Sequence, residues 1–470
     1  MNVLKSRAFH FALWLLVGAA PFFIDPPQDM TKTGWHVLGI FAATILSFLL
    51  RPLPMGPMVL LGLIALSATQ TLDFETVLSG YGEKVVWLVV AAFLIAGAVG
   101  RTGFGRRIAL TLVAKLGRST LGLGYAICGS ELLLGPVVPS NTARGGGIIA
   151  PIVHSLSGAL GSTPSEKPER AGSYLTLVGA HANLIAAAMF LTGMAANGLV
   201  SAAADDVFGV EFGWGTWALG AIVPGLIGLA LLPLFIYKLA RPTLEDGTAA
   251  QTQALSELSD MGGWSRAQIT MAVVFVTMLG LWCTQPWHGM HPGIVAWVGV
   301  CGLLVSGADD WQDMTNDPKP WDTLIWLGGL LAMANALKNE GVVKFFADIM
   351  ESQVGGLSPV AAVIVLGLVY FYSMYGFSMF TAHISAMVFA FFTVALALDA
   401  PPLLMIGVFA YFSNLCGCTT NYSTGPVVIY FGLGYVPAGQ WFRIGALMSL
   451  FHLLIWLTIG MAWWKLIGWW

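Results

Sequence analysis

Charged residues are scarce in this chain of 470 residues, since only 10% of them are Asp, Glu, Lys or Arg. Soluble globular chains carry about 25% charged residues, so the low fraction excludes a mainly soluble protein. Hydrophobic residues make up 57% of the chain, and the mean hydropathy is +0.78. The sequence therefore predicts an all-α polytopic membrane protein, with room for roughly a dozen spans of ~20 residues.

Cysteines and catalytic motifs are also few. The five cysteines lie in or beside apolar runs, and their odd number predicts free thiols without a disulfide framework. Cys416 and Cys418 are too sparse to form a metal site by themselves. There is no HExxH motif, and Asp309 and Asp310 fall in a predicted loop. These absences argue against an intramembrane enzyme, and we expect no metal, no cofactor and no nucleic-acid partner.

One polar stretch interrupts the apolar sequence. Residues Gly135–Ile152 read GPVVPSNTARGGGIIAPI, with two prolines, the triplet Ser140-Asn141-Thr142, the charge of Arg144 and three glycines. Irregular backbone at membrane depth is tolerated only where it is buried in protein or lines a cavity, and polar groups there are costly. We therefore predict the tip of a re-entrant hairpin that offers hydroxyls, an amide and backbone N–H groups to a ligand. The alternative is a polar loop between two ordinary spans.

The basic residues predict an orientation. If the N-terminus is cytoplasmic and both 121–160 and 359–398 are re-entrant hairpins, 16 of the 21 Lys and Arg residues fall on the inner side. The first 25 residues resemble a signal peptide but lack a convincing cleavage site, so they are interpreted as the first span. We expect a multi-pass protein of the cell (inner) membrane, with membrane lipid as a partner.

An internal repeat emerges when the chain is shifted by about 240 residues. The apolar segment from Trp87 matches the one from Trp326 at an offset of 239, and VGAHANLI around Asn183 matches CGCTTNYS around Asn421 at 238. The first tip matches the triplet Thr381-Ala382-His383 at an offset of 241. With the orientation above, the two hairpins open on opposite sides. An inverted-topology repeat of this kind is typical of secondary transporters.

The repeat predicts where a substrate binds. Two hairpin tips meet near the midplane, and helices broken around Gly179–Asn183 and Gly417–Pro426 form the other walls. Helix N-termini at such breaks favour carboxylate groups. The predicted substrate-binding residues are Ser140, Asn141, Thr142, Asn183, Thr381, His383, Thr419, Thr420, Asn421, Ser423, Thr424 and Gly425.

Several side chains allow a second interpretation. Arg144 is either a ligand or a snorkelling cytoplasmic residue, and His383 is either a ligand or a hydrogen-bonded core histidine. Glu131 either carries a proton or caps a local N–H group. A cation/proton antiporter would also use broken helices, but it would need Asp or Glu at the breaks. Neither Gly179–Asn183 nor Gly417–Gly425 contains one.

At these residues the chain resembles the divalent anion/sodium symporter (DASS) family of di- and tricarboxylate transporters. The resemblance rests on the SNT signature at Ser140-Asn141-Thr142, and it covers nearly the whole chain. The segments MFTAHISA and TTNYSTGP are similar to the exchanger branch, which includes citrate/succinate antiporters and 2-oxoglutarate/malate translocators. Sodium-coupled members carry a second SNT, where this chain has Thr381-Ala382-His383.

The resemblance implies eleven transmembrane helices plus two re-entrant hairpins, a homodimer and an elevator mechanism. It implies transport of C4–C5 dicarboxylates such as succinate, malate and 2-oxoglutarate. The lost second SNT favours sodium-independent antiport over sodium-coupled symport. The residues leave open which carboxylate is preferred. The expected division is scaffold 1–84, repeat 85–215, second scaffold part 216–322, repeat 323–441 and C-terminal helix 442–470.

Overall fold

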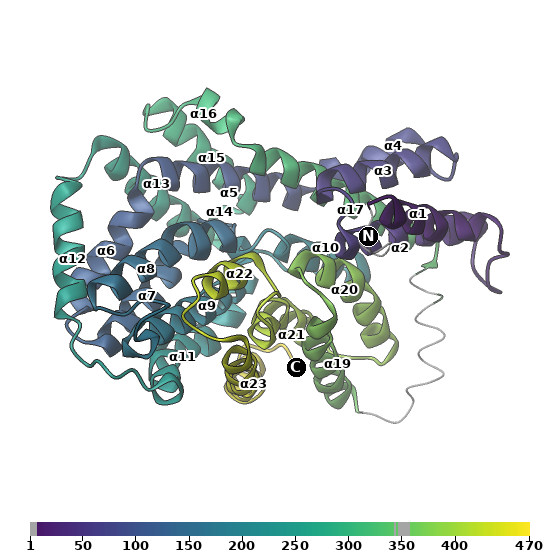
Figure 1. The fold of residues 1–470 in the computed structure, drawn as a ribbon. Coiled ribbons are helices and arrows are strands. Elements are labelled where there is room, and N and C mark those ends of the chain that lie inside the picture. The colour runs from purple at the N-terminus through teal and green to yellow at the C-terminus, as the bar shows by residue number, and fades with distance from the viewer. Residues whose placement is uncertain (1–6, 343–344, 346–357) are drawn as a thin grey trace.

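The computed structural model describes residues 7–342, 345 and 358–470 (Figure 1). Within these residues the chain is built of helices, and its only bridge between extended segments joins Ser119 to Asp246. Eight helices are long and apolar enough to cross a membrane, and four shorter apolar helices accompany them in the described part. The predicted all-α polytopic fold is thereby confirmed.

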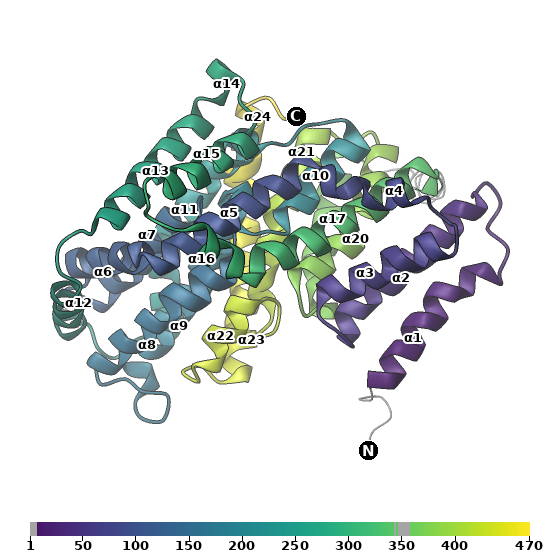
Figure 2. The same cartoon turned by 90° about the horizontal axis from the view of Figure 1, so that it is seen from above.

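The N-terminal helices form one flank of the molecule, drawn in purple in Figures 1 and 2. They are α1 (Arg7–Ala19), η2 (Ala20–Phe22), α2 (Lys32–Leu50), α3 (Met55–Ala68), α4 (Phe74–Leu78) and η3 (Ser79–Gly82). Thr31 caps the start of α2 by accepting a hydrogen bond from the Gly34 N–H. Arg51 ends α2 in the left-handed conformation with φ 51°.

The next helices include the first hairpin and the element that follows it. They are α5 (Lys84–Arg101), α6 (Phe104–Leu116), α7 (Thr120–Leu134), η4 (Thr142–Ile149), α8 (Ala150–Ala159), η5 (Pro168–Arg170), α9 (Gly172–Met189), η6 (Leu191–Gly193) and α10 (Asn197–Phe208). η4 is a turn of π-helix. Helix α9 is buried along its whole length, so it forms a central axis of the fold.

A long connecting region covers the first hairpin. It consists of α11 (Trp214–Ala240), α12 (Thr248–Asp260), α13 (Arg266–Cys283), α14 (Gln285–His288), α15 (Pro292–Val305) and α16 (Trp311–Asn316). Helix α11 packs on α9, and α12 packs on α6 and α8 (Figure 2). Arg106 on α6 forms an ion pair with Glu257 on α12 at 2.8 Å, which fixes α12 beside the hairpin.

The second half repeats the order of elements. It contains α17 (Pro318–Asn339), α19 (Pro359–Ser373), η7 (Met374–Gly376), α20 (Phe380–Ala397), α21 (Pro402–Leu415), η8 (Cys416–Thr419) and α22 (Gly425–Gly432). The chain ends with α23 (Ala438–Ile455), η9 (Trp456–Gly460) and α24 (Met461–Leu466). Together, α19 and α20 form the second hairpin beside α10 and α21 (Figure 1).

The two hairpins correspond at an offset of 239 residues. Helices α7 and α19 both have 15 residues, and Ser119 and Ser358 cap them in the same way. The returning segment becomes helical at Asn141 in the first hairpin and at Phe380 in the second. The sequence-based match of the tips at 241 was therefore two residues out of register.

The first broken helix lies elsewhere than predicted. Helix α9 runs without interruption through Gly179–Asn183, and the break follows it, where Phe190 and Met194 are extended on either side of η6. Asn197 Nδ2 donates to the Ala187 and Phe190 carbonyls at 3.1 and 3.0 Å. The Asn197 side chain thus binds carbonyls at the end of α9, where the Phe190 carbonyl also accepts from the Gly193 N–H at 2.8 Å. The second break, between η8 and α22, lies where the sequence predicted it.

Candidate functional site

A buried ion pair holds the first hairpin together. Arg144 Nε donates to Glu131 Oε2 at 2.7 Å, and neither side chain is exposed. Arg144 Nη1 also donates to the carbonyls of Val138 at 2.7 Å and Gly193 at 3.0 Å. The charge at the first tip is therefore compensated inside the protein, and Arg144 links the hairpin to the break after α9.

Asn183 on α9 completes this network from the other side. Its Nδ2 donates to both Glu131 oxygens at 3.0 and 3.2 Å and to the Asn141 carbonyl at 3.1 Å. A Cβ at Gly145 would lie 2.5 Å from Asn183 Nδ2, so the close approach requires glycine. Asn183, a predicted site residue, holds the backbone of the SNT tip.

The first tip meets the second break, which lies far along the chain. Asn141 Nδ2 donates to Thr424 Oγ1 at 3.3 Å, across 283 residues of sequence. Thr142 packs directly on Gly425, where any Cβ would collide with the threonine side chain. The start of the returning helix of hairpin one and the start of α22 are therefore adjacent. Both helix starts carry partial positive charge, and at the first one Ser140 Oγ accepts from the Ala143 N–H at 3.1 Å.

The hydroxyls of the second break divide into two groups. Thr419 and Ser423 are buried and donate to the carbonyls of Cys416 at 2.8 Å and Gly417 at 2.7 Å, so they stabilise the unwound backbone. Thr420 is equally buried, but among the described residues its Oγ1 only accepts, from the Tyr422 N–H at 3.4 Å. Asn421 is half-buried, and its side chain has no hydrogen-bond partner among the described residues. Thr420 and Asn421 thus keep donors for a ligand.

The second tip approaches the same break from the other repeat. A Cβ at Gly417 would collide with the Phe380 ring, so that ring lies against the η8 backbone. Tyr422 Oη donates to the Tyr375 carbonyl at 3.0 Å. Thr381 is half-buried, and its hydroxyl has no partner in the described part of the chain. The tip is thus attached to the break beside Thr420 and Asn421.

His383 is a buried member of the second hairpin. Its Nε2 lies 2.8 Å from Ser373 Oγ and 3.1 Å from the Tyr370 carbonyl. Its ring packs on Tyr370, with centroids 4.3 Å apart, and on Phe377 at 5.1 Å. At the offset of 239, His383 corresponds to Arg144 and Tyr370 to Glu131. The same two positions join each hairpin, by charge in one and by ring packing in the other.

The corrected register changes the composition of the second tip. The positions that correspond to Ser140, Asn141 and Thr142 are Met379, Phe380 and Thr381. Only the threonine is common to the two tips. Apolar side chains stand where the first tip has a hydroxyl and an amide. The second tip therefore keeps one hydroxyl of the triplet, as it does in the sequence-based match, but Thr381 now corresponds to Thr142 instead of Ser140.

Polar residues around the first break were missed by the sequence analysis. Thr192 Oγ1 donates to the Pro136 carbonyl in the hairpin tip and accepts from Trp214 Nε1 at 2.9 Å. Asn414 Nδ2 donates to Asn197 Oδ1 at 2.9 Å and so joins the two repeats. In the sequence, these residues stand singly among apolar neighbours. Their hydrogen-bond partners lie far along the chain, so no local pattern marks them as site residues.

Taken together, the structure connects Asn141, Thr142, Asn183, Thr424 and Gly425 directly. It attaches the second tip to the same break. The available groups are hydroxyls, amides and helix starts rather than an uncompensated charged side chain among the described residues at the site. Neutral donors of this kind suit an anion that must both bind and leave.

Comparison with known families places the chain in context. Residues 5–470 match the family described as the sodium:sulfate symporter transmembrane region. YflS of Bacillus subtilis (strain 168), named provisionally as a malate transporter, is 44% identical over 455 residues, which cover 97% of this chain and 95% of that protein. Dicarboxylate transporter 1, chloroplastic, of Arabidopsis thaliana is 39% identical over 459 residues, covering 97% of this chain and 82% of the relative.

A solved structure shares the fold. The YdaH transporter of Alcanivorax borkumensis is similar over 84% of this chain and 88% of its own, with a TM-score of 0.58 and 14% sequence identity. At this identity the likeness supports the architecture alone. It supports the predicted arrangement of spans and hairpins independently of the sequence relatives.

Proposed function

Because this chain belongs to the sodium:sulfate symporter family, we propose that it exchanges C4–C5 dicarboxylates across a membrane without sodium. The relatives named for malate and dicarboxylate transport support the substrate class. The observation that carries the proposal is the Asn141–Thr424 hydrogen bond of 3.3 Å, which brings two helix starts together. Two such starts and their side-chain donors offer one dianion several N–H and O–H groups.

We assign the two carboxylates to the two tips. One carboxylate binds Ser140, Asn141 and Thr142, and the other binds Thr381, Thr420 and Asn421. His383, Thr419, Ser423 and Asn183 support these groups from behind, because their own hydrogen bonds are made within the protein. Gly425 keeps the space in which Thr142 packs.

The second tip supports sodium independence. Hard cations are held by oxygen ligands, and transporters coordinate sodium with unwound backbone carbonyls and side-chain oxygens. Met379 and Phe380 supply neither a hydroxyl nor an amide where the first tip has Ser140 and Asn141. A cage equivalent to that of a sodium-coupled relative is therefore incomplete on this side.

Obligate exchange requires that the empty site crosses the membrane slowly. Arg144 does not supply the barrier, since Glu131 neutralises it at 2.7 Å. The helix starts and the unpaired donors of Thr381 and Asn421 remain, and burying such groups without partners costs free energy. A dicarboxylate satisfies them, so the loaded site moves more readily than the empty one.

We further propose an elevator mechanism in a homodimer of the inner membrane, with a cytoplasmic N-terminus. The repeats 85–215 and 323–441 carry the site as one moving unit. Residues 1–84 and 216–322 form the scaffold, with 442–470 as a C-terminal helix. The direct links between the repeats, Asn141–Thr424 and Asn197–Asn414, support a unit that moves as a whole.

Uptake of labelled malate into proteoliposomes tests the proposal. Vesicles are prepared with and without internal unlabelled malate, each in sodium and in potassium. Uptake only into preloaded vesicles, equal in both salts, is the expected result. Sodium-driven uptake into empty vesicles would instead establish a sodium-coupled symporter. The same four conditions are repeated with labelled succinate and with labelled 2-oxoglutarate. Absence of uptake of all three compounds would contradict the substrate class.

A further inference from the structure

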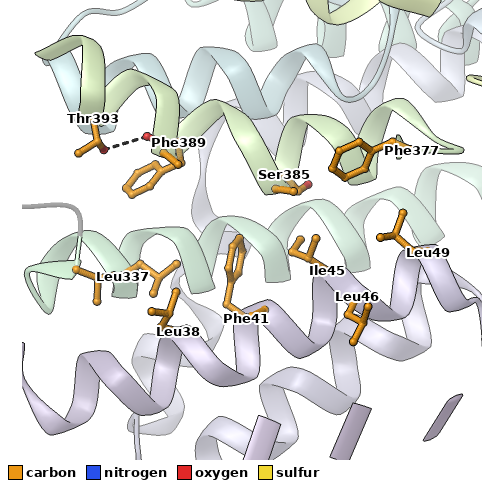
Figure 3. A pocket seen from close by; sticks show the side chains of 14 residues that line it. Leu38, Phe41, Ile45, Leu46, Leu49, Leu337, Phe377, Ser385, Phe389 and Thr393 are labelled. Atoms are coloured by element: carbon orange, nitrogen blue, oxygen red, sulfur yellow. Dashed lines mark hydrogen bonds between the residues drawn. The ribbon is translucent and has the colours of Figure 1, made fainter. Parts of the chain in front are cut away.

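An apolar groove separates α2 from the second hairpin. Its volume is about 400 Å³ (Figure 3). One wall is a stripe of α2 formed by Leu38, Phe41, Ile45 and Leu49. The opposite wall comes from the second hairpin and consists of Phe377, Ser385, Phe389 and Thr393. The groove is open at its edge, where Ala42, Leu49 and Ala390 are exposed.

The length and direction of the groove are set by α2. Leu38, Phe41, Ile45 and Leu49 follow one another at helical spacing, so they line one face over about 16 Å. Each leaflet of a bilayer has a hydrocarbon depth of about 15 Å. The 19 residues of α2 make it long enough to cross a membrane, so the groove runs along the direction of lipid chains. Its length matches one acyl chain.

A basic residue stands at one end of the groove. Arg51 follows Leu50, the last residue of α2, and its Nη2 donates to the Ser378 carbonyl and Oγ, both at 3.3 Å. Ser378 follows Phe377, so this contact marks the same end of the groove. Arg51 is exposed, and within the described residues it has no carboxylate partner. Arg51 follows the last residue of a helix long enough to span a membrane, and basic side chains at the ends of such helices extend toward lipid phosphates.

Ser385 adds a second polar feature inside the groove. Its Oγ is buried and has no hydrogen-bond partner in the described part of the chain. The side chain points into the space between α20 and α2 (Figure 3). Thr393, on the same helix, instead donates to the Phe389 carbonyl at 2.9 Å. A buried hydroxyl without a partner is costly, and an acceptor within the groove would satisfy it.

We propose that this groove binds one bilayer phospholipid. One acyl chain lies between α2 and α20, the phosphate pairs with Arg51, and an ester carbonyl accepts from Ser385. Guanidinium groups bind phosphate through charge-assisted hydrogen bonds. The lipid contacts α2 of the scaffold and α20 of the second hairpin. It therefore lies at the boundary across which the hairpin would slide, a consequence that rests on the proposed elevator function.

Native mass spectrometry of the purified full chain with palmitoyl-oleoyl phosphatidylglycerol tests the site. The expected result is one tightly held lipid per chain. Ala386→Phe, which fills the groove, and Ala42→Phe, which closes its edge, should each lose that lipid. Val276→Phe is the matched control, because Val276 is 67% exposed on α13, outside the groove. Arg51→Gln should weaken lipid binding at least fivefold, with Arg51→Lys retaining most of it.

Two outcomes would overturn the proposal. Equal lipid retention in both groove variants and in the control would show that the bound lipids lie elsewhere. A change of oligomeric mass in Ala386→Phe and Ala42→Phe, at an unchanged lipid count, would make the groove an interface between copies. The lipid count is read without any transport assay, so failure of dicarboxylate exchange and failure of the lipid site are distinguishable.

Discussion

Arg144 and Glu131 form an ion pair from which solvent is excluded, with Nε 2.7 Å from Oε2 and neither side chain exposed. Two opposite charges that the sequence presents 13 residues apart become one neutral unit at the base of the SNT tip. The buried ion pair therefore stabilises the conformation of the tip, while the exposed groups of the tip are uncharged.

Removing one member of this pair should destabilise the protein strongly. Glu131→Gln leaves the Arg144 charge buried without a counter-ion, which costs about 3–5 kcal/mol. We expect a large fall in the melting temperature, measured by intrinsic fluorescence in detergent. In the double variant Glu131→Gln/Arg144→Gln, the melting temperature should fall by less than the sum of the falls in the two single variants.

An exposed pair provides the control for this experiment. Arg106 and Glu257 form an ion pair at 2.8 Å, but the Arg106 side chain is 58% exposed. Such pairs contribute about 0–1 kcal/mol, so Arg106→Gln should change the melting temperature little. Equal shifts for Glu131→Gln and Arg106→Gln would contradict the structural role of the buried pair.

Asn141→Ala and Thr424→Ala should weaken substrate binding, because each removes one end of the contact that joins the two helix starts. A neutral hydrogen bond contributes about 1 kcal/mol, so each variant should raise KM roughly fivefold through this contact alone, and more if the side chain also binds substrate. In the double variant, KM should rise by less than the product of the two single increases, because both substitutions break the same contact. The measurement is malate/malate exchange at varied malate concentration.

Thr252→Ala is the matched control for the hydroxyl deletion. Thr252 lies exposed on α12, and within the described part of the chain its hydroxyl donates only to the Thr248 carbonyl of its own helix, at 2.9 Å. Its exchange kinetics should equal those of the unsubstituted chain. Fully additive effects of Asn141→Ala and Thr424→Ala would indicate that the two residues act separately, against a shared site.

Asn414→Asp should damage the protein more than Asn414→Ala. Asn414 Nδ2 donates to Asn197 Oδ1 at 2.9 Å in a fully buried position. Alanine leaves that oxygen unsatisfied, at a cost of about 1–3 kcal/mol. Aspartate also removes the donor and places a second oxygen against the first, in a site where an unpaired charge is expensive. Melting temperatures of the two variants give the order, and a milder effect of aspartate would contradict this geometry.

Much of the architecture could be predicted from the sequence, since hydropathy reports spans and polar interruptions report hairpin tips. The apolar match of Trp87 with Trp326 gave the offset of 239 that the helix boundaries confirm. The tip match failed by two residues because it paired polar letters by type. In the structure, Asn141 and Phe380 occupy equivalent backbone positions. Asparagine and phenylalanine are chemically unlike, so a comparison by residue type does not pair them.

The position of the first break illustrates a second limit of sequence reasoning. Gly179 and Asn183 look like helix breakers in an apolar run, yet both lie inside α9. Tyr430 packs on Gly179, and Glu131 accepts a hydrogen bond from Asn183. Partners far along the chain therefore explain why glycine and asparagine occur inside a continuous helix. Thr192 and Asn197 mark the true break through contacts that also depend on the folded chain.

The register of the second tip gives the sharpest test of sodium independence. If Met379 and Phe380 are the positions that abolish the cation cage, Met379→Ser with Phe380→Asn should restore an SNT triplet ending at Thr381. Oxygen ligands would then face the break from both tips, and sodium should stimulate malate transport. Proteoliposome uptake in sodium and in potassium measures the effect.

The control for this variant must reproduce its packing defect. The Phe380 ring lies against Gly417, and deleting a buried aromatic ring costs about 3–5 kcal/mol. Met379→Ala with Phe380→Ala loses the same ring without gaining a hydroxyl or an amide. Sodium stimulation in the Ser/Asn variant alone would assign the effect to the new oxygen ligands. An equal response of both variants to sodium would show that these two positions do not decide coupling.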